Sequence, residues 1–402
     1  MSEDRRTIVV TAIGVVSPYG VGFRLMSKAL LAGRCCLGPL QGFSTGFDAT
    51  VGEIGCLTPI EDLHEFRPSR TDQLAIRAAR DAAAISGLED RAFREAAVVM
   101  ATTVSGLTEI DPALVLDPLA WYRAGGLARA QSYPCSHVAD AVGEYLDARG
   151  PRFAVNVACA SGAIAIALGA NLLLDDAVPM ALVGGSDALC PFTLSGFHAL
   201  QALDAAPCRP FDQNRGGLNL GEGAAVLALE TLATARKRSA PILAVLRGWA
   251  MTNDAFHLTA PHEQGRGLAE CMLLAMERAD VAPDDVGYVN AHGTGTLLND
   301  AAETRAYERA FGQRARPVPV SSTKSYFGHC LGAAGAIEAA VTISGIRAGV
   351  LYPTLRLSEP IETPAVEWLT GQPRRQQLPL AMTVSAGFGG SNAALVFGAY
   401  SE

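Results

Sequence analysis

Short apolar runs rich in β-branched residues alternate along this chain with longer Ala-rich segments that carry the period of a helix. The apolar runs predict strands over 7–12, 97–102, 180–184, 224–230, 242–247, 286–290, 317–321 and 394–397. The Ala-rich segments predict helices over 72–86, 161–174, 265–280, 300–311 and 333–347. Alternation of this kind is typical of a layered α/β fold.

A charged segment in the middle of the chain indicates a seam between two halves. The segment from 231 to 241 (TLATARKRSAP) ends in Pro, and we expect the halves to be 1–238 and 239–402. The stretch NVACASGAIAIALGA in the first half resembles GHCLGAAGAIEAAVTIS in the second. Chance can produce such a likeness, and so can duplication. Under duplication the two strand-to-helix turns could face one another across a site.

Composition narrows the class of protein. The 402 residues are 49% apolar and 18% charged, which is typical of a soluble α/β protein. A net charge of −8 without any Lys/Arg run argues against nucleic acid as a partner. The nine cysteines contain no CxxC pair, so they indicate neither a disulfide framework nor a zinc site. Because no signal peptide is present and the Ala-rich stretches are broken by Arg and Asp, we expect a cytoplasmic protein that does not cross a membrane.

Cys159 lies within NVACASGA, where an apolar run gives way to an expected helix. The unpaired N–H groups and the dipole of a helix N-terminus can lower a thiol pKa, which favours the reactive thiolate. Small neighbours would let a substrate carbonyl approach, with the Cys159 N–H as an oxyanion donor. The alternative is a buried filler, because free Cys is among the most buried residue types.

Two further stretches carry histidines. In NAHGTGTLLNDAAET (290–304), His292 follows an expected strand, and the hydroxyls of Thr294 and Thr296 could line one side of a tunnel and bind a ligand amide. In SSTKSYFGHCLGAAGA (321–336), Lys324 and His329 lie five residues apart on a loop that turns into a helix. Taken alone, a histidine placed like His292 is more often structural than catalytic.

Lys324 in so apolar a stretch needs a counter-charge, because burying an unpaired ammonium is costly. Asp300 and Glu303, on the helix after His292, are the expected partners.

The Gly-rich stretch SAGFGGSN (385–392) predicts either a tight β-turn or a mobile strap over a site, with Phe388 as an apolar gate and a second oxyanion donor. One reactive Cys with two His suits a decarboxylating Claisen condensation, in which the Cys carries an acyl group as a thioester.

These stretches together resemble the elongating β-ketoacyl-acyl-carrier-protein synthases, the condensing enzymes of fatty acid and type II polyketide assembly. The likeness covers nearly the whole chain and includes RRTIVVTAIGVVSPYG, NVACASGA, RPFDQNRGGLNLGEGAAVLALE, NDAFHLTAP, AHGTGT, STKSYFGHCLGAAGA and GFGGSN. It implies a thiolase-like fold of two similar halves, each with a five-stranded mixed sheet, in layers α-β-α-β-α. It also implies a dimer formed through the first half.

The resemblance implies a role for each candidate residue, without a cofactor or a metal. It implies that Cys159 is the acyl-accepting nucleophile and that His292 and His329 decarboxylate the malonyl group. Lys324 would order the His pocket with Glu303 as its acidic partner, and the Cys159 and Phe388 amides would form the oxyanion hole. The residues implied to hold the phosphopantetheine arm are Thr259, Thr294 and Thr296. A second Cys in the closing loop would indicate a thiolase, and Asn in place of His329 would indicate a starter-type synthase.

Departures from the family pattern bear on substrate and partner. Gly216-Gly217-Leu218-Asn219 replaces the usual DGFV, Ala386 replaces a bulky residue and Ser391 replaces a Thr. These departures indicate a specialised pathway.

The expected partners are an acyl carrier protein and either a second copy or a chain-length-factor homologue. The candidate carrier contacts are Arg67, Arg70 and Arg77. The alternatives are a non-catalytic pairing subunit, which the intact Cys-His-His set argues against, and a Cys-dependent acyl hydrolase, which the second His fits poorly.

Overall fold

The computed structural model describes residues 3–60, 67–86, 93–109 and 117–401. Its main strands are hydrogen-bonded into one continuous 12-stranded arrangement, in which the first half contributes a five-stranded sheet of order β1-β8-β7-β5-β6. These strands span Ile8–Ser17 (β1), Gly223–Thr231 (β8), Met180–Asp187 (β7), Ala97–Ala101 (β5) and Arg152–Val155 (β6). β8 is antiparallel to both neighbours, whereas β5 is parallel to β7 and β6.

The second sheet repeats this topology, in the order β9-β16-β15-β10-β11. Its strands span Ala244–Asn253 (β9), Ser391–Gly398 (β16), Leu380–Ala386 (β15), Val289–Asn290 (β10) and Val318–Ser321 (β11). The parallel and antiparallel pairings match those of the first sheet strand for strand. Two similar halves are therefore confirmed, and their helix-opening turns occupy corresponding places in the two halves. β13 (Val366–Trp368) adds a further parallel strand beside β11.

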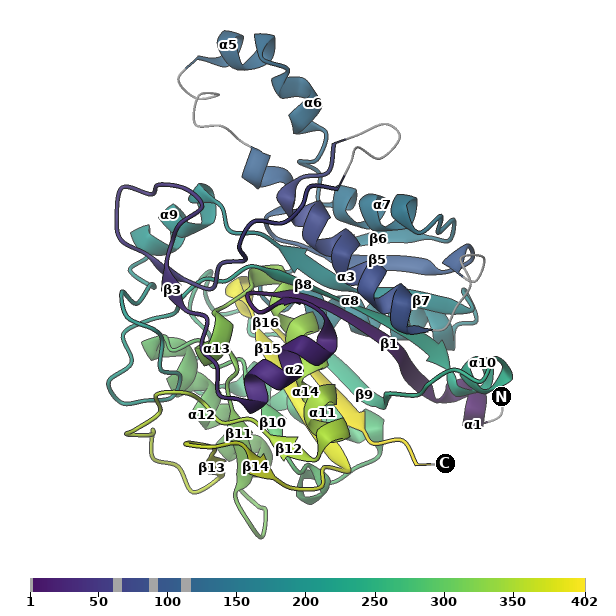
Figure 1. Cartoon of the computed structure of the whole chain (residues 1–402). Helices are drawn as coiled ribbons and strands as arrows, with labels where there is room; N and C mark the ends of the chain where they lie inside the picture. Colours follow the sequence, from purple (N-terminus) through teal and green to yellow (C-terminus); the bar gives the residue numbers. More distant parts are fainter. Residues whose placement is uncertain (1–2, 61–66, 87–92, 110–116, 402) are drawn as a thin grey trace.

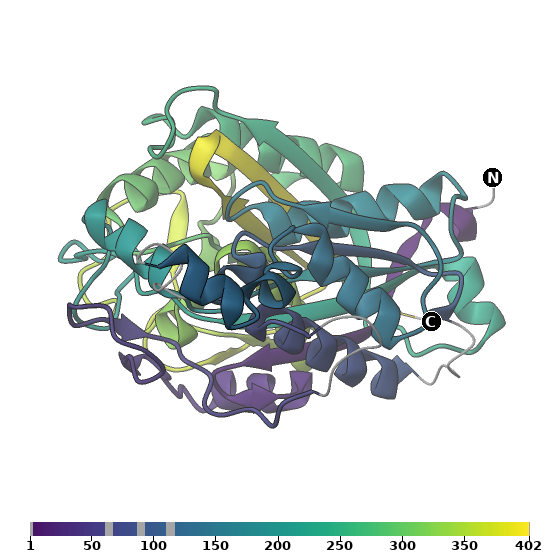
Figure 2. The ribbon, with the colours of Figure 1, turned by 90° about the horizontal axis from the view of Figure 1, so that it is seen from above.

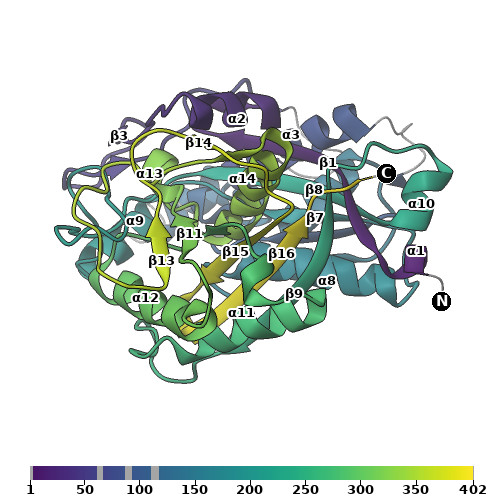
Figure 3. The ribbon, with the colours of Figure 1, turned by 90° about the horizontal axis from the view of Figure 1, so that it is seen from below.

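Five layers result from the packing of helices on these sheets (Figure 1). α3 (Arg70–Ser86) and α7 (Ser136–Tyr145) cover the outer face of the first sheet. α11 (Arg266–Ala279) and α12 (Leu297–Phe311) cover the outer face of the second, which Figure 3 shows from below. α8 (Ser161–Leu174) and α14 (Ala334–Ala348) lie between the sheets in the largest core cluster. β1 and β9 pair over Ile8–Val10 and so join the two sheets.

Both central helices are apolar on nearly all sides because they are covered on nearly all sides. By length and composition, the segment Leu331–Ala348 could cross a membrane, which differs from the sequence-based expectation. In the structure, 89% of this segment is buried, as for a core helix. The two helices touch backbone to backbone. A Cβ added to Gly162 would lie 2.7 Å from the Ala336 amide nitrogen, and one added to Gly335 would lie 2.6 Å from that of Ala163. The small residues after Cys159 therefore serve helix packing.

The remaining elements connect this framework. They are α1 (Glu3–Arg6), β2 (Gly20–Val21), α2 (Phe23–Leu31), β3 (Gly38–Pro39), β4 (Thr50–Val51), α5 (Pro118–Arg123), α6 (Gly126–Ala130), α9 (Pro191–Ala199), α10 (Leu232–Lys237), α13 (Lys324–Phe327), β12 (Val350–Leu351) and β14 (Arg374–Arg375), with short 3₁₀ turns at Ser105–Glu109, Pro283–Asp285, Leu331–Ala333 and Phe388–Gly390. Both chain ends lie at the same end of the molecule, which is clear from above in Figure 2. We propose 238/239 as the domain boundary, between α10 and β9.

Every strand and helix expected from the apolar pattern is present; α8 has the predicted ends, and at least one end of each of the others is shifted. The pattern missed the sheet strands β6 and β15, the helices α2, α7 and α9, and the short elements β2, β3, β4, β12, β13, β14, α1, α5, α6, α10 and α13. β6 consists of four residues with three of them exposed, so it lacks a continuous apolar run. All nine cysteines are free.

Candidate active site

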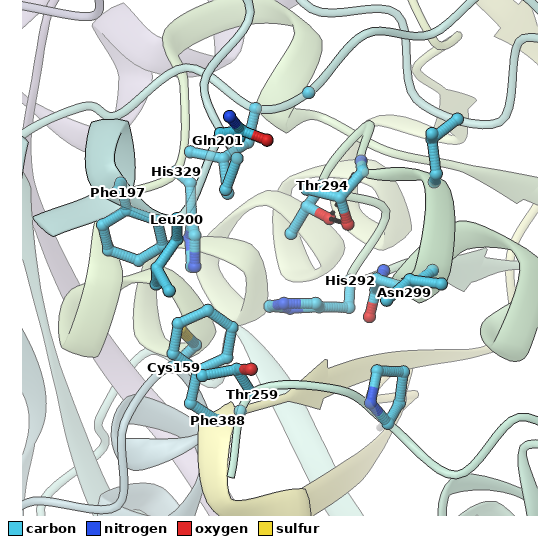
Figure 4. A pocket seen from close by; sticks show the side chains of 18 of the residues that line it. Cys159, Phe197, Leu200, Gln201, Thr259, His292, Thr294, Asn299, His329 and Phe388 are labelled. Atoms are coloured by element: carbon cyan, nitrogen blue, oxygen red, sulfur yellow. Dashed lines mark hydrogen bonds between the residues drawn. The ribbon is translucent and has the colours of Figure 1, made fainter. Parts of the chain in front are cut away.

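A pocket of about 300 Å³ opens where the N-terminal ends of the two central helices meet the loops of the second half. Seven of the nine sequence-predicted site residues line it: Cys159, Thr259, His292, Thr294, Thr296, His329 and Phe388 (Figure 4). Lys324 and Glu303 lie behind the pocket wall and are buried. The structure therefore brings together side chains that lie up to 229 positions apart, from Cys159 to Phe388.

Cys159 lies at the tip of a tight turn that precedes α8. Ala158 adopts φ 49°, in the left-handed region that is strained for a residue with a side chain. Ser161 fixes the turn, because its hydroxyl donates to the Ala158 carbonyl (2.5 Å) and accepts from the Val157 amide (2.7 Å). The thiol is thereby held at the floor of the pocket, where it is only 7% exposed.

The expectation that the helix N-terminus lowers the thiol pKa is wrong for this structure. Burial raises the pKa of Cys159 to about 12, against the opposing influence of the Lys324 ammonium and of a hydrogen bond from the Phe388 amide. Desolvation outweighs these two contributions because it penalises the thiolate over its whole surface. At neutral pH the resting residue is therefore a thiol, and the proton must leave as the sulfur reacts.

The closing Gly-rich stretch is a tight turn between β15 and β16 that lies directly over the cysteine. Gly389 and Gly390 take φ values of 81° and 79°, which glycine adopts without strain. A Cβ added to Gly387 would lie 3.1 Å from the Cys159 amide nitrogen. The Phe388 ring stacks on Phe197 of α9 with centroids 5.6 Å apart. Both backbone amides expected to form the oxyanion hole thus lie beside the sulfur.

His292 and His329 face one another edge to face, with ring centroids 5.3 Å apart. Burial lowers the pKa of both imidazoles well below the ordinary value, and the Lys324 ammonium acts in the same direction. Both rings are therefore neutral at pH 7, and each carries one N–H donor. Neither ring nitrogen of His329 has a protein partner within the described residues, so both are free for a ligand.

Lys324 fixes the orientation of His292. Its ammonium donates to the His292 carbonyl (2.5 Å) and to Nδ1 (3.3 Å), and it forms a buried ion pair with Glu338 of α14. An ammonium can only donate, so Nδ1 accepts and the His292 proton lies on Nε2. The counter-charge is therefore Glu338, and the expectation that Asp300 or Glu303 pairs with Lys324 is wrong. Burial raises the pKa of Glu338 to about 7.

Glu303 shapes the backbone of the His292 turn and does not line the pocket, which corrects its expected contact with substrate. Its carboxylate accepts from the amides of His292 and Gly293, both at 2.7 Å, and from the Tyr307 hydroxyl at 2.6 Å. Burial raises its pKa to about 7. Asp300 accepts from the Phe211 amide at 2.7 Å. Both acids hold loops in place.

Polar groups line the outer part of the pocket. Thr294 and Thr296 present hydroxyls 3.0 Å apart, with Thr259 on a facing loop (Figure 4). Asn299 also lines this part, although the sequence did not single it out. Its amide nitrogen donates to Glu303 (3.1 Å) and Asp300 (3.2 Å), and its spacing of four from Glu303 on one helix was the available signal.

Asp187 is a second residue that sequence reasoning missed. It ends β7, is fully buried and accepts from Thr102, Thr103, Val104 and the Gly332 amide, the last at 2.6 Å. Gly332 lies three residues after His329, so this carboxylate ties the His329 loop to the first half. A lone Asp at the end of a strand gives no sequence signal for such a tie.

Three of the departures from the family pattern, Gly216, Gly217 and Leu218, line the pocket, whereas Asn219, Ala386 and Ser391 are not among its lining residues. Asn219 binds the loop before it, accepting from the Cys208 amide at 2.6 Å and donating to the carbonyls of Asp204 and Ala206. Its own carbonyl accepts from the His329 amide at 2.8 Å.

Comparison with known proteins agrees with this arrangement. Residues 5–235 match the family model of the β-ketoacyl synthase N-terminal domain, and residues 243–358 match that of the C-terminal domain. The chain is 36% identical to the tetracenomycin polyketide synthase ketoacyl synthase alpha subunit of Streptomyces glaucescens, over 97% of this chain and 96% of that one. It is 33% identical to 3-oxoacyl-[acyl-carrier-protein] synthase 2 of Coxiella burnetii, over 98% of each chain.

Among solved structures, the ishigamide ketosynthase/chain length factor superposes with a TM-score of 0.91 at 30% identity, covering 99% of this chain and 100% of that one. The thiolase-like fold is confirmed by this likeness and by the repeated sheets. The chain belongs to the β-ketoacyl synthase family, whose two domain models together match most of its length.

Proposed function

We propose that this chain is an elongating β-ketoacyl-acyl-carrier-protein synthase in which Cys159, His292 and His329 carry the chemistry. The observation that supports this most is the convergence of one buried thiol and two neutral imidazoles on a single pocket. A neutral imidazole donates a hydrogen bond without bringing a charge, which suits stabilisation of an enolate in a dry site.

The first step transfers an acyl group from a carrier thioester to Cys159. The sulfur attacks the thioester carbonyl, the new C–S bond forms, and the carrier sulfur leaves with the proton that the thiol gives up. The amides of Cys159 and Phe388 stabilise the oxyanion that develops. The high thiol pKa keeps the resting residue protonated, so the thiolate forms only during this exchange.

The second step consumes a malonyl thioester. His292, through Nε2–H, and His329 donate to the malonyl thioester oxygen, so the bond to the carboxylate breaks, CO₂ leaves and an enolate remains. The enolate carbon attacks the acyl-Cys159 carbonyl and displaces the sulfur, which regains a proton from solvent. The product is a 3-oxoacyl group on the carrier, two carbons longer than the acyl group that was loaded.

The remaining residues position these groups. Thr259, Thr294 and Thr296 lie where hydroxyls can bind the amides of a phosphopantetheine arm. Lys324 sets the tautomer of His292, and Glu303 holds its backbone. Glu338 joins this set as the counter-charge of Lys324.

We propose an acyl carrier protein and a second thiolase-like subunit as partners, in the cytoplasm. The names of the relatives support this, since one is a 3-oxoacyl-[acyl-carrier-protein] synthase and one solved neighbour is a ketosynthase with a chain length factor. A specialised pathway is favoured by the unusual wall residues Gly216, Gly217 and Leu218. The second subunit is either another copy or a chain-length-factor homologue.

Mass spectrometry of the intact protein tests the proposal. Incubation with an acyl-loaded carrier should add one acyl mass, and Cys159→Ala should abolish the addition. His329→Ala should retain loading and lose release of CO₂ from a malonyl carrier. If no carrier acylates the wild-type chain, alone or with its paired subunit, the chain is a non-catalytic pairing subunit and the proposal is wrong.

A further inference from the structure

We infer that Asn219 is a positioning residue for His329, and this inference rests on the proposed function. Asn219 does not line the pocket and is only 1% exposed. It stands where the usual family pattern has Val, whose side chain has no polar group. The hydrogen bonds of the Asn219 side chain are therefore absent from that pattern.

The two histidines of the pocket are oriented in different ways (Figure 4). The Lys324 ammonium donates to His292 Nδ1 at 3.3 Å and so fixes that ring directly. Neither ring nitrogen of His329 has a partner within the described residues. The position of the His329 ring therefore depends on its backbone and on the packing around it.

The segment from Asn219 to Gly221 holds the His329 backbone by both its amide and its carbonyl. The Asn219 carbonyl accepts from the His329 amide at 2.8 Å, and the Gly221 amide donates to the His329 carbonyl at 2.9 Å. Gly328 packs against the same segment, since a Cβ added to it would lie 3.0 Å from the Asn219 carbonyl oxygen. A displacement of this segment would therefore displace His329.

The Asn219 side chain anchors this segment to the loop of residues 204–208. Its amide oxygen accepts from the Cys208 amide at 2.6 Å. Its amide nitrogen donates to the carbonyls of Asp204 and Ala206, at 2.8 and 3.1 Å. One acceptor and two donors are used together, so the side chain is fixed in a single orientation.

This loop has few other anchors. Residues 205–208 make no backbone-to-backbone hydrogen bond within the described part of the chain, and Pro207 has no N–H to donate. The Thr50 hydroxyl donates to the Ala205 carbonyl at 2.6 Å, and the Arg356 guanidinium donates to the Cys208 carbonyl at 3.1 Å. Asn219 alone contributes three hydrogen bonds, so it is the main anchor of the loop.

Asn219 lies in the middle of three short segments that run side by side. Isolated parallel bridges join Leu203 to Leu218 on one side and Leu220 to His329 on the other. The side chain of Asn219 reaches toward the first segment, while its carbonyl reaches the third. Loosening of its side chain is therefore transmitted to His329 through two backbone contacts.

The Cys159 turn does not depend on this arrangement, because the Ser161 hydroxyl holds it from within the turn. Misplacement of a catalytic group by about 1 Å can lower a rate about 100-fold. Loss of the Asn219 side chain should therefore slow the step that needs His329, which is malonyl decarboxylation. Acyl loading of Cys159 should be nearly unchanged.

The test replaces Asn219 with the residue of the usual family pattern. Asn219→Val removes all three side-chain bonds, and Asn219→Asp, which cannot make both donations, carries the same test if the Val variant does not fold. The control Ser344→Ala removes two buried hydrogen bonds, of 2.7 and 2.8 Å, near the far end of α14. Release of CO₂ from a malonyl-loaded acyl carrier protein and acylation of Cys159 by an acyl-loaded one are measured separately, well below the Tm of each protein.

We expect Asn219→Val to lower kcat for CO₂ release by about 10-fold or more, with its KM and the loading rate changed by less than about twofold. The control should change neither reaction. A higher KM at unchanged kcat would mean that Asn219 only shapes the pocket wall, and equal losses in both reactions would mean general damage. Either result, or no change, overturns the inference. Failure of the wild-type protein to release CO₂, alone or with its paired subunit, overturns the proposed function instead, so the two failures are distinguishable.

Discussion

The protonation of Cys159 provides the sharpest test of how burial controls this site. At pH 8 a thiol of pKa about 12 is ionised in about 10⁻⁴ of the molecules. An ordinary free thiol of pKa about 8.5 is ionised in about a quarter of them at the same pH. Raising the pH from 7 to 10 should therefore increase the rate of Cys159 alkylation about tenfold per unit, without a plateau.

The assay follows iodoacetamide labelling of the Cys159 peptide by mass spectrometry, with free cysteine in the same tube as the reference. The reference should level off above pH 9, whereas Cys159 should continue to rise. The slope with pH matters more than the absolute rate, because limited access to a buried sulfur slows labelling at every pH alike. A plateau of the Cys159 rate below pH 9 would refute the reasoning and show that the helix N-terminus outweighs burial.

The same experiment on Lys324→Met identifies the opposing influence. The ammonium is the largest contribution that lowers the Cys159 pKa, so its removal should slow labelling further at each pH. Lys324→Arg retains the charge and serves as the control. Faster labelling of the Met variant would contradict the assigned sign.

Three more outcomes are expected. Asp187→Asn should slow malonyl decarboxylation about 10- to 100-fold, because it loosens the His329 loop. Acyl loading, measured separately, should be less affected, and equal losses in both reactions would indicate general damage to the fold. Lys324→Met should lower the free energy of unfolding by about 3–5 kcal/mol by leaving Glu338 unpaired, and adding Glu338→Leu should restore part of it in urea titrations. Gly162→Ala should lower the free energy of unfolding by about 1–3 kcal/mol, because the new Cβ would lie 2.7 Å from a backbone nitrogen of α14. The control Gly196→Ala should not destabilise the protein, because its Cβ would meet nothing within 4 Å.

Burial explains why the thiol and the imidazoles all shift toward their neutral forms. Desolvation penalises any charged group, whether thiolate or imidazolium. Behind the pocket wall, Lys324 forms its ion pair with Glu338 and does not face the substrate. The site therefore presents neutral donors to a substrate whose charge develops only during the reaction.

The apolar pattern alone determined most of the framework. Long segments such as 161–174 and 333–347 have strong helical composition, and their helices lie at α8 and α14 as expected. Cys159, His292 and His329 could be selected because each sits in a Gly- or Ala-rich turn beside an expected element. Local signals of this kind survive folding, because they depend on neighbours in the chain.

Tertiary structure decided what depends on distant neighbours. Glu338, and not Glu303, pairs with Lys324, because α14 packs its Glu338 against the Lys324 loop while Glu303 faces the His292 amides. The direction of the Cys159 pKa shift follows from burial between two halves, which no local pattern reports. Short β6 gained its place by pairing with β5, and the pocket exists only because segments from both halves converge there. The local sequence around each residue identified the reacting groups. Contacts between segments that are distant in the sequence determined their protonation states and their hydrogen-bond and ion-pair partners.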